Sequence, residues 1–237
     1  QWIVDTCGSV PGGVFAWPAP DSSLGAFLPE LCLCATIVLM LLIRVFPWGR
    51  RVDVFYFALA GSGIALAFLA PWEHLGSGEL GPSYHPLGRA ETFTGMLVYD
   101  AFSVFMRPLL IGFAFLFALF TKLSGVPDRE DGPDIYTLVL GAILGMCLMV
   151  SANHLLMVFL AVEMASVPSY VLAGLLKGRR SGSEAALKYS IYGAGTAGVM
   201  LYGISLMAGL FNTAHLPTLA QRMSEQLPGM ESGETLV

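Results

Sequence analysis

Long apolar runs dominate this sequence and restrict the chain to a fold that lies in a membrane. Six of them are long enough to cross the roughly 30 Å hydrocarbon layer of a bilayer as helices. We predict transmembrane helices over residues 24–46, 54–72, 97–120, 135–152, 154–176 and 184–211. Only 12% of the residues are charged, which is too few to cover the surface of a soluble fold. The predicted fold class is therefore all-α, a polytopic membrane protein with six transmembrane helices.

The segments outside the helical region 24–211 are more polar. Residues 1–23 are rich in Pro and Gly and predict an exterior extension, and residues 212–237 predict a polar exterior segment. Lys and Arg are enriched in the cytoplasmic loops of membrane proteins. Near the span ends, one side has only Arg89 and Arg222, whereas the other has Arg44, Arg50, Arg51, Lys122, Arg129, Lys177, Arg179 and Arg180. We expect the richer side to be cytoplasmic and both termini to lie outside.

Several common functions are not expected. The net charge of −5 and the absence of a basic stripe argue against a nucleic-acid partner. The four cysteines do not have the spacing of an iron–sulfur or metal site, so no metal and no redox cofactor are expected. Gly193, Gly195 and Gly198 match a dinucleotide-binding pattern, but they lie inside an apolar helical run. There, like Gly141 and Gly145, they predict close helix packing through small residues.

Glu163 is the strongest candidate for a functional residue. It lies near the middle of the predicted fifth span, with apolar neighbours and no opposite charge within one helical turn. An ionised group at that depth is costly, so an intramembrane carboxylate that can hold and release a proton is a functional hypothesis. Pro168 deprives the carbonyl of Met164 of its helical partner and predicts a helix distortion beside the carboxylate. The alternative is a structural hydrogen bond from Glu163 to another helix.

Lys188 and Arg107 are the other ionisable candidates within predicted spans. Lys188 lies nearer the cytoplasmic end than Glu163, and bridging waters could connect the two side chains as a proton relay. Alternatively, Lys188 extends toward the lipid headgroups, with Glu184 four residues earlier as a helix pair. Asp100 and Arg107 share one helix face, and we favour structural roles for both, with Asp100 matched to the helix dipole.

Three motifs in the second half of the chain carry a family resemblance. They are Ala-Asn-His-Leu-Leu-Met-Val-Phe-Leu-Ala-Val-Glu at 152–163, Ser-Val-Pro-Ser-Tyr-Val-Leu at 166–172 and Glu-Ala-Ala-Leu-Lys-Tyr at 184–189. Weaker markers are Leu-Pro-Glu-Leu at 28–31 and Tyr-Asp-Ala-Phe-Ser at 99–103. Together they resemble subunit N of the proton-pumping NADH:quinone oxidoreductases, the respiratory complex I family. The resemblance extends over about residues 24–209.

The resemblance implies an antiporter-like subunit built from two inverted helix bundles, in the inner membrane of a bacterium or a mitochondrion. The implied partners are other membrane-arm subunits and the lipid bilayer. In that family the glutamate matched by Glu163 is a proton-channel residue, and Lys188 takes the position of the sixth-helix lysine. The family glutamate works against a lysine on a broken seventh helix. This chain stops before such a helix, so we expect a fragment or a split or truncated subunit.

Three functional hypotheses follow. The first is a proton-translocating membrane-arm subunit of NADH:quinone oxidoreductase, a translocase without a redox centre of its own. In it Glu163 and Lys188 transfer protons and Pro168 distorts the helix. The second is a subunit of a multisubunit cation/proton antiporter that is not linked to electron transfer but uses the same Glu163. The third is a non-transporting membrane assembly element, in which the small-residue helix faces matter and the charges do not.

Overall fold

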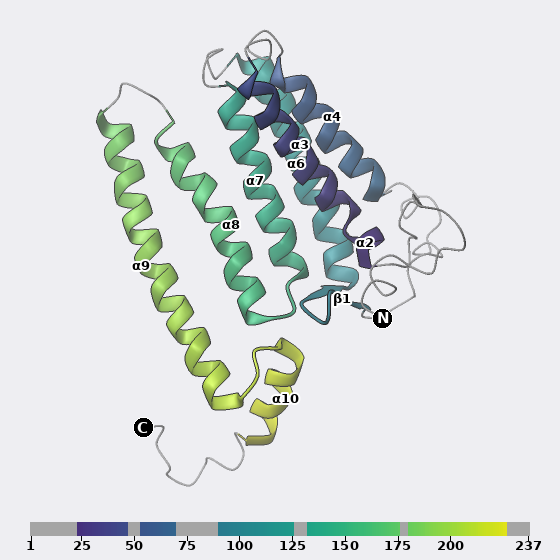
Figure 1. The fold of residues 1–237 in the computed structure, drawn as a ribbon, viewed down its shortest axis with the longest axis vertical. Helices are drawn as coiled ribbons and strands as arrows, with labels where there is room; N and C mark the ends of the chain where they lie inside the picture. The colour runs from purple at the N-terminus through teal and green to yellow at the C-terminus, as the bar shows by residue number, and fades with distance from the viewer. Residues whose placement is uncertain (1–22, 47–52, 70–89, 126–131, 176–179, 227–237) are drawn as a thin grey trace, which may run out of the picture.

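Long helices lying roughly side by side make up most of the structure, with a short hairpin and a short helix at one end (Figure 1). The computed structural model describes residues 23–46, 53–69, 90–125, 132–175 and 180–226. The long helices are α3 (Leu28–Val45), α4 (Val54–Leu69), α6 (Ala101–Ser124), α7 (Gly132–Ser151), α8 (Leu155–Ala173) and α9 (Arg180–Phe211). The shorter elements are α2 (Ser23–Ala26), α10 (Leu216–Gln226) and the antiparallel strands β1 (Ala90–Thr92) and β2 (Leu97–Tyr99).

Five helices of the described part are long and apolar enough to cross a membrane, namely α3, α6, α7, α8 and α9. The remaining long helix, α4, is apolar but has only 16 residues. The prediction of six spans is therefore confirmed for five helices, whereas α4 covers residues 54–69 of the second predicted span, and residues 70–72 lie outside the described residues. The predicted all-α fold class also left out the short hairpin, because the first three residues of the expected third span form strand β2. Asp100 then starts α6 as its N-cap, where its Oδ1 accepts the Ser103 N–H at 2.9 Å.

The structure describes only part of the two polar segments predicted at the ends of the chain. The exterior segment predicted over residues 212–237 contains the helix α10, which packs near the end of α9. The extension predicted over residues 1–23 lies almost entirely outside the described residues. The placement of both flanks on the exterior side stays a prediction.

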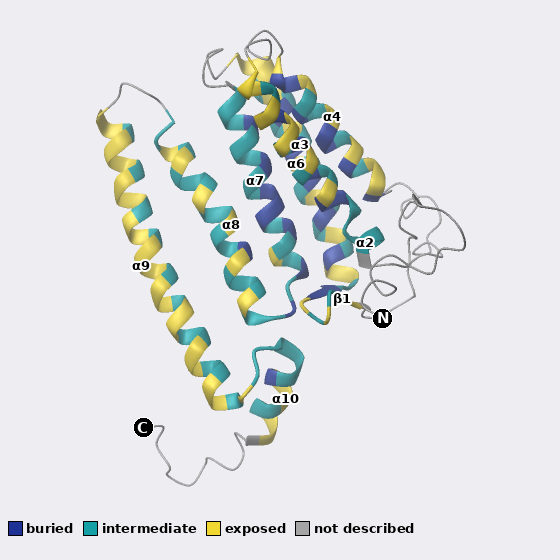
Figure 2. Ribbon diagram, viewed as in Figure 1, coloured by how far each residue is buried: buried dark blue, intermediate teal, exposed yellow. Residues whose placement is uncertain are grey.

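The buried core lies among α3, α4, α6 and α7, as the dark blue segments in Figure 2 show. Leu33, Ile111 and Ile143 are among its most completely buried side chains. Gly61 allows α4 to approach α3, because a Cβ at this position would overlap the Thr36 side chain. By contrast, α9 buries none of its residues. The chain therefore has a packed four-helix core, flanked on one side by α8 and then α9.

The last turn of α3, the last turn of α6 and the start of α9 lie at the upper end of the bundle in Figure 1, and they carry Arg44, Lys122 and Arg180. Arg44, at the end of α3, forms an ion pair with Asp134 at the start of α7, with 3.1 Å between Nη2 and Oδ2. Lys122 Nζ, at the end of α6, lies 3.5 Å from Asp53 Oδ2. Arg222 lies on α10 at the opposite end. The described residues therefore agree with the predicted division of basic residues between the two sides of the membrane. Of the eight basic residues predicted on the cytoplasmic side, five lie outside the described residues.

Candidate functional site

Glu163 lies at the middle of α8. It is eight residues from the first residue of the helix, which is about 12 Å along the axis at 1.5 Å per residue. Its side chain is half-buried in this chain. Within the described ranges, no Lys, Arg or His side chain forms an ion pair with it. The structure therefore places a carboxyl group halfway along an apolar helix without a charge partner among the residues it describes.

Two glycines of α7 bring that helix against the same segment of α8. A Cβ added at Gly145 would lie 2.6 Å from the backbone nitrogen of Ala165 and 3.0 Å from the carbonyl oxygen of Ala161. A Cβ at Gly141 would lie 3.7 Å from the ring of Pro168. Such close approach of two helix backbones requires small residues at the contact. The α7 contact therefore extends along α8 on both sides of Glu163.

The segment of α8 around Glu163 has irregular hydrogen bonding. Pro168 lies within the helix and has no N–H to donate to the carbonyl of Met164. Ser166 Oγ donates to the carbonyl oxygen of Val162 at 2.7 Å, and Ser169 Oγ donates to that of Ser166 at 2.6 Å. Hydroxyls bound to carbonyls of the preceding turn often bend a helix. Polar backbone and hydroxyl groups therefore follow Glu163 along this apolar helix.

Lys188 is not brought to Glu163. Its Nζ lies 2.6 Å from Oε1 of Glu184, one turn earlier on α9, and the two side chains are 65% and 63% exposed. Because α9 begins at Arg180, Lys188 is about 12 Å from the helix start, deeper than a start at residue 184 would place it. This ion pair between Lys188 and Glu184 is the interaction that the sequence offered as the alternative to a proton relay. The two residues predicted to transfer protons therefore lie on neighbouring helices without direct contact.

Tyrosines form the contact between α8 and α9. The Tyr170 ring meets the Tyr189 ring edge-to-face, with 4.7 Å between centroids, and it fills the space that a side chain at Gly193 would need. Ser169 Oγ also lies 3.3 Å from the Tyr189 hydroxyl. Sequence reasoning missed this contact, because isolated Ser and Tyr residues carry no distinctive spacing. Packing through small residues thus occurs at Gly193, whereas nothing lies within 4 Å of a Cβ at Gly195 or Gly198.

The most deeply buried charges lie away from Glu163. Glu30, in the first turn of α3, is 0% exposed, and Arg107 of α6 is 3% exposed. Arg107 Nε and Nη2 lie 2.6 and 2.5 Å from Glu30 Oε1, and the guanidinium lies 5.0 Å from the centre of the Tyr99 ring. Sequence reasoning grouped Arg107 with Asp100 on one helix face. It missed the ion pair because 77 residues separate the partners.

The described histidines have structural contacts. His154 Nδ1 accepts the Leu156 N–H at the start of α8, 3.3 Å away. His215 Nε2 lies 2.9 Å from Asn153 Nδ2, and this contact joins the loop before α10 to the turn between α7 and α8. His215 Nδ1 lies 2.9 Å from Thr218 Oγ1 in the first turn of α10. In the part of the chain that the structure describes, no three His, Cys, Asp or Glu side chains are grouped as metal ligands.

Known proteins with similar sequences share one description. The NADH-quinone oxidoreductase subunit N 2 of Symbiobacterium thermophilum is 31% identical over 214 residues, which cover 90% of this chain and 42% of that protein. The subunit N 2 of Sorangium cellulosum is 37% identical over 209 residues, which cover 86% of this chain and 40% of that protein. Subunit N of Anaeromyxobacter sp. is 36% identical over 228 residues, with 92% and 40% covered. The chain spans about two fifths of the length of these relatives.

Family and structure comparisons agree with these relatives. Residues 152–236 match the family described as NADH:quinone oxidoreductase/Mrp antiporter, TM. A chain of respiratory complex I from Thermus thermophilus with bound aureothin has a TM-score of 0.58 and 29% identity, covering 85% of this chain and 42% of that one. A chain of the archaeal membrane-bound sulfane sulfur reductase has a TM-score of 0.64 and 19% identity, covering 84% and 40%, and shows a shared fold. The chain is therefore a homologue of NADH-quinone oxidoreductase subunit N with the fold of an antiporter-like membrane subunit, matching about 40% of the full-length protein.

Proposed function

We propose that this chain forms part of a proton-translocating membrane-arm subunit of an NADH:quinone oxidoreductase. Electron transfer from NADH to quinone takes place in other subunits, and proton movement through this one is coupled to it. The subunit crosses the bacterial inner membrane several times and is held by other membrane-arm subunits. It has no redox centre of its own. The similarity to subunit N proteins over most of the chain supports this proposal.

The observation that carries the proposal is the position of Glu163. A half-buried carboxyl group at the centre of an apolar helix is costly to ionise unless a cation approaches it. Within the described residues it has no such cation. In this proposal, charges brought to it by other parts of the assembly set its protonation state. That dependence is what a coupled proton carrier requires.

Pro168 and Lys188 have supporting roles in this proposal. The Met164 carbonyl freed by Pro168 offers a site for water beside Glu163, so that a proton can reach the carboxyl group. Lys188 supplies protons from the cytoplasmic side, after it leaves Glu184. The Lys188–Glu184 pair lies on the outside of the helix bundle rather than in its core, so Lys188 is free to leave Glu184. The Ser169 and Tyr189 hydroxyls lie at the helix contact between Lys188 and Glu163.

The substitution Glu163→Gln in the full-length subunit tests the proposal. Gln keeps the size of the side chain but cannot release a proton, so we expect NADH-driven proton translocation into membrane vesicles to fall to a small fraction. The complex should still assemble and reduce quinone. Glu225→Gln, which changes an exposed carboxylate on α10, is the matched control and should pump normally. Normal proton translocation by Glu163→Gln would refute the proposal.

A subunit of a cation/proton antiporter without electron transfer is the second candidate. The observation in its favour is the matched family, whose description includes both the oxidoreductase and the Mrp antiporter and whose match contains Glu163 and Lys188. Purification from membranes separates the two functions. Recovery with NADH-oxidising subunits supports the first, whereas cation/proton exchange without added NADH, in a complex lacking those subunits, supports the second.

A further inference from the structure

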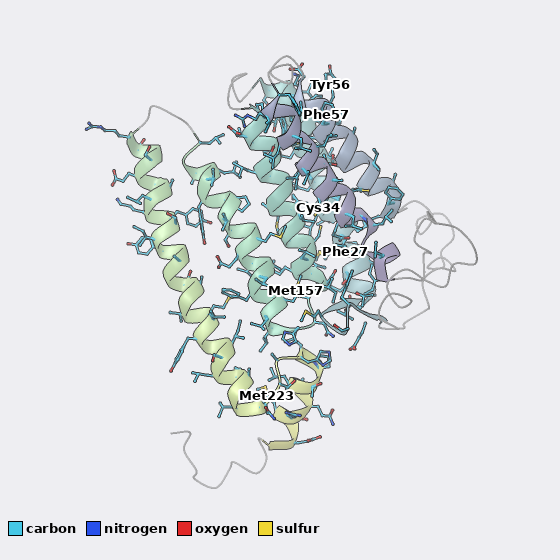
Figure 3. All side chains as sticks on the ribbon, in the orientation of Figure 1. Phe27, Cys34, Tyr56, Phe57, Met157 and Met223 are labelled. Atoms are coloured by element: carbon cyan, nitrogen blue, oxygen red, sulfur yellow. The ribbon has the colours of Figure 1, made fainter. Side chains whose placement is uncertain are left out.

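A small cavity lies where the hairpin meets the ends of α6 and α7. It is lined by Ala26 and Phe27 at the junction of α2 and α3, by Phe93 and Tyr99 of the hairpin region, and by Arg107 and Ser151. Figure 3 places Phe27 toward the end of the bundle away from Tyr56 and Phe57, which lie at the start of α4. The Phe27 and Phe93 rings meet edge-to-face, with 5.4 Å between centroids.

Two residues that line the cavity each have a buried polar atom without a hydrogen-bond partner among the described residues. These atoms are Arg107 Nη1 and Ser151 Oγ, and each belongs to a residue that is only 3% exposed. Arg107 directs Nε and Nη2 to Glu30, which leaves Nη1 as a donor. Buried polar groups in native proteins nearly always have a partner, either a protein atom or an ordered water. The cavity is thus a built polar site that needs an occupant able to accept from Arg107.

The charges of Arg107 and Glu30 indicate whether this occupant is an anion or a neutral molecule. Glu30 already neutralises Arg107 at contact distance, and the Tyr99 ring faces the guanidinium as well. A small anion in the cavity would leave a net negative charge among apolar walls, which is unfavourable. A water molecule is neutral, accepts from Nη1 and can donate to Ser151 Oγ or accept from it. The cavity has room for about one water molecule.

We propose that this cavity binds an ordered water molecule that joins Arg107 Nη1 to Ser151 Oγ. The water links α6 to the last residue of α7 beside the hairpin, and it completes the hydrogen bonding of the buried guanidinium. The Phe27 and Phe93 rings cover one side of it. This site is separate from the function proposed for Glu163, and its failure would leave that function unaffected.

A density map of the full-length protein in its membrane assembly tests this site, at a resolution that shows ordered water. We expect a solvent peak within hydrogen-bond distance of both Arg107 Nη1 and Ser151 Oγ. In Ser151→Ala the water loses one of its two partners, and we expect this peak to be lost. A dry cavity in the wild-type protein, or a peak unchanged in Ser151→Ala, would overturn the proposal.

Two controls make the test specific. Ser62→Ala removes another fully buried hydroxyl, but one that donates to the Ala58 carbonyl of its own helix at 2.7 Å. The solvent peak beside Arg107 should be unchanged in this variant, and its loss would also contradict the proposal. Crystals grown in bromide identify the occupant, since bromide scatters anomalously and water does not. An anomalous peak beside Arg107 would show that the site takes an anion instead.

Discussion

Glu30 and Glu163 lie within apolar helices but in different surroundings. Glu30 is completely buried and bound to Arg107, whereas Glu163 is half-buried and has no ion pair among the described residues. A buried carboxylate held by an arginine is costly to neutralise, because its partner would then be a buried unpaired charge. Glu30 is therefore suited to hold α3 against α6. In the proposed function, Glu163 is the carboxyl group that takes up and releases the proton.

Removing one partner of the buried pair should be more harmful than removing both. Arg107→Leu leaves Glu30 buried without a counter-charge, and we expect it to lower the free energy of unfolding by about 3–5 kcal/mol. The double variant Glu30→Leu/Arg107→Leu removes both charges and should recover most of that loss. Thermal unfolding of the purified full-length protein measures both. A double variant no more stable than Arg107→Leu would contradict this account.

Lys188 should matter for proton supply rather than for stability. Its ion pair with Glu184 lies on the outside of the helix bundle rather than in its core, so Lys188→Met should change the free energy of unfolding far less than Arg107→Leu does. We expect the same variant to lower NADH-driven proton translocation, though less than Glu163→Gln does. Lys122→Met is a suitable control, because Lys122 is also a partly exposed basic residue near the same end of the bundle. Equal translocation by the Lys188 and Lys122 variants would argue against a relay.

At the scale of single elements, the close contact of α7 with α8 fixes the surroundings of Glu163. Gly145 faces the α8 backbone at Ala161 and Ala165, on either side of the carboxylate. The contact involves backbone atoms, which cannot move aside as a flexible side chain can. The packing at Gly145 thus controls how close α7 lies to the proposed proton site.

A methyl group at Gly145 should separate these two helices. In Gly145→Ala the new Cβ would lie 2.6 Å from the Ala165 nitrogen, and overpacking of this kind destabilises a fold by about 1–3 kcal/mol. We expect a lower melting temperature and reduced proton translocation. Gly112→Ala on α6 adds the same methyl group where nothing lies within 4 Å, so it should be neutral or slightly stabilising. Equal melting temperatures and equal proton translocation in the two variants would show that the packing at Gly145 does not matter for this site.

Apolar runs predicted the long helices well, but not where they begin or how they pair. Residues 97–99 are apolar and precede a helix, yet they form strand β2, since hydropathy does not separate a short strand from a helix start. The position of Glu163 along α8 could be predicted because it depends on local sequence alone. The partners of Arg107 and Lys188 could not, because they depend on which helix faces meet.

For the molecule as a whole, the direction of the helices brings three of the described basic residues to one end. Arg44, Lys122 and the start of α9 at Arg180 share that end, whereas α10 lies at the other (Figure 1). Because Lys and Arg are enriched on the cytoplasmic side, α10 should face the exterior. The exposed apolar side chains of α9, such as Val199 and Tyr202, then lie within the membrane.

Cysteine labelling tests this orientation. In a cysteine-free full-length protein, Ser183→Cys at the start of α9 should react with a membrane-impermeant maleimide only from the cytoplasmic side. Ser224→Cys on α10 should react only from the exterior. Both serines are exposed, so access through the protein does not limit the reaction. The reverse labelling pattern would invert the proposed direction of proton movement through the chain.

In the proposed function Glu163 changes its protonation state while the complex works, and infrared difference spectroscopy detects such a change. In the assembled wild-type complex, NADH-driven turnover should change the carbonyl band of a protonated carboxyl group. That change should be absent in Glu163→Gln and present in Glu225→Gln. A wild-type spectrum without such a band, or the same band in Glu163→Gln, would contradict the claim.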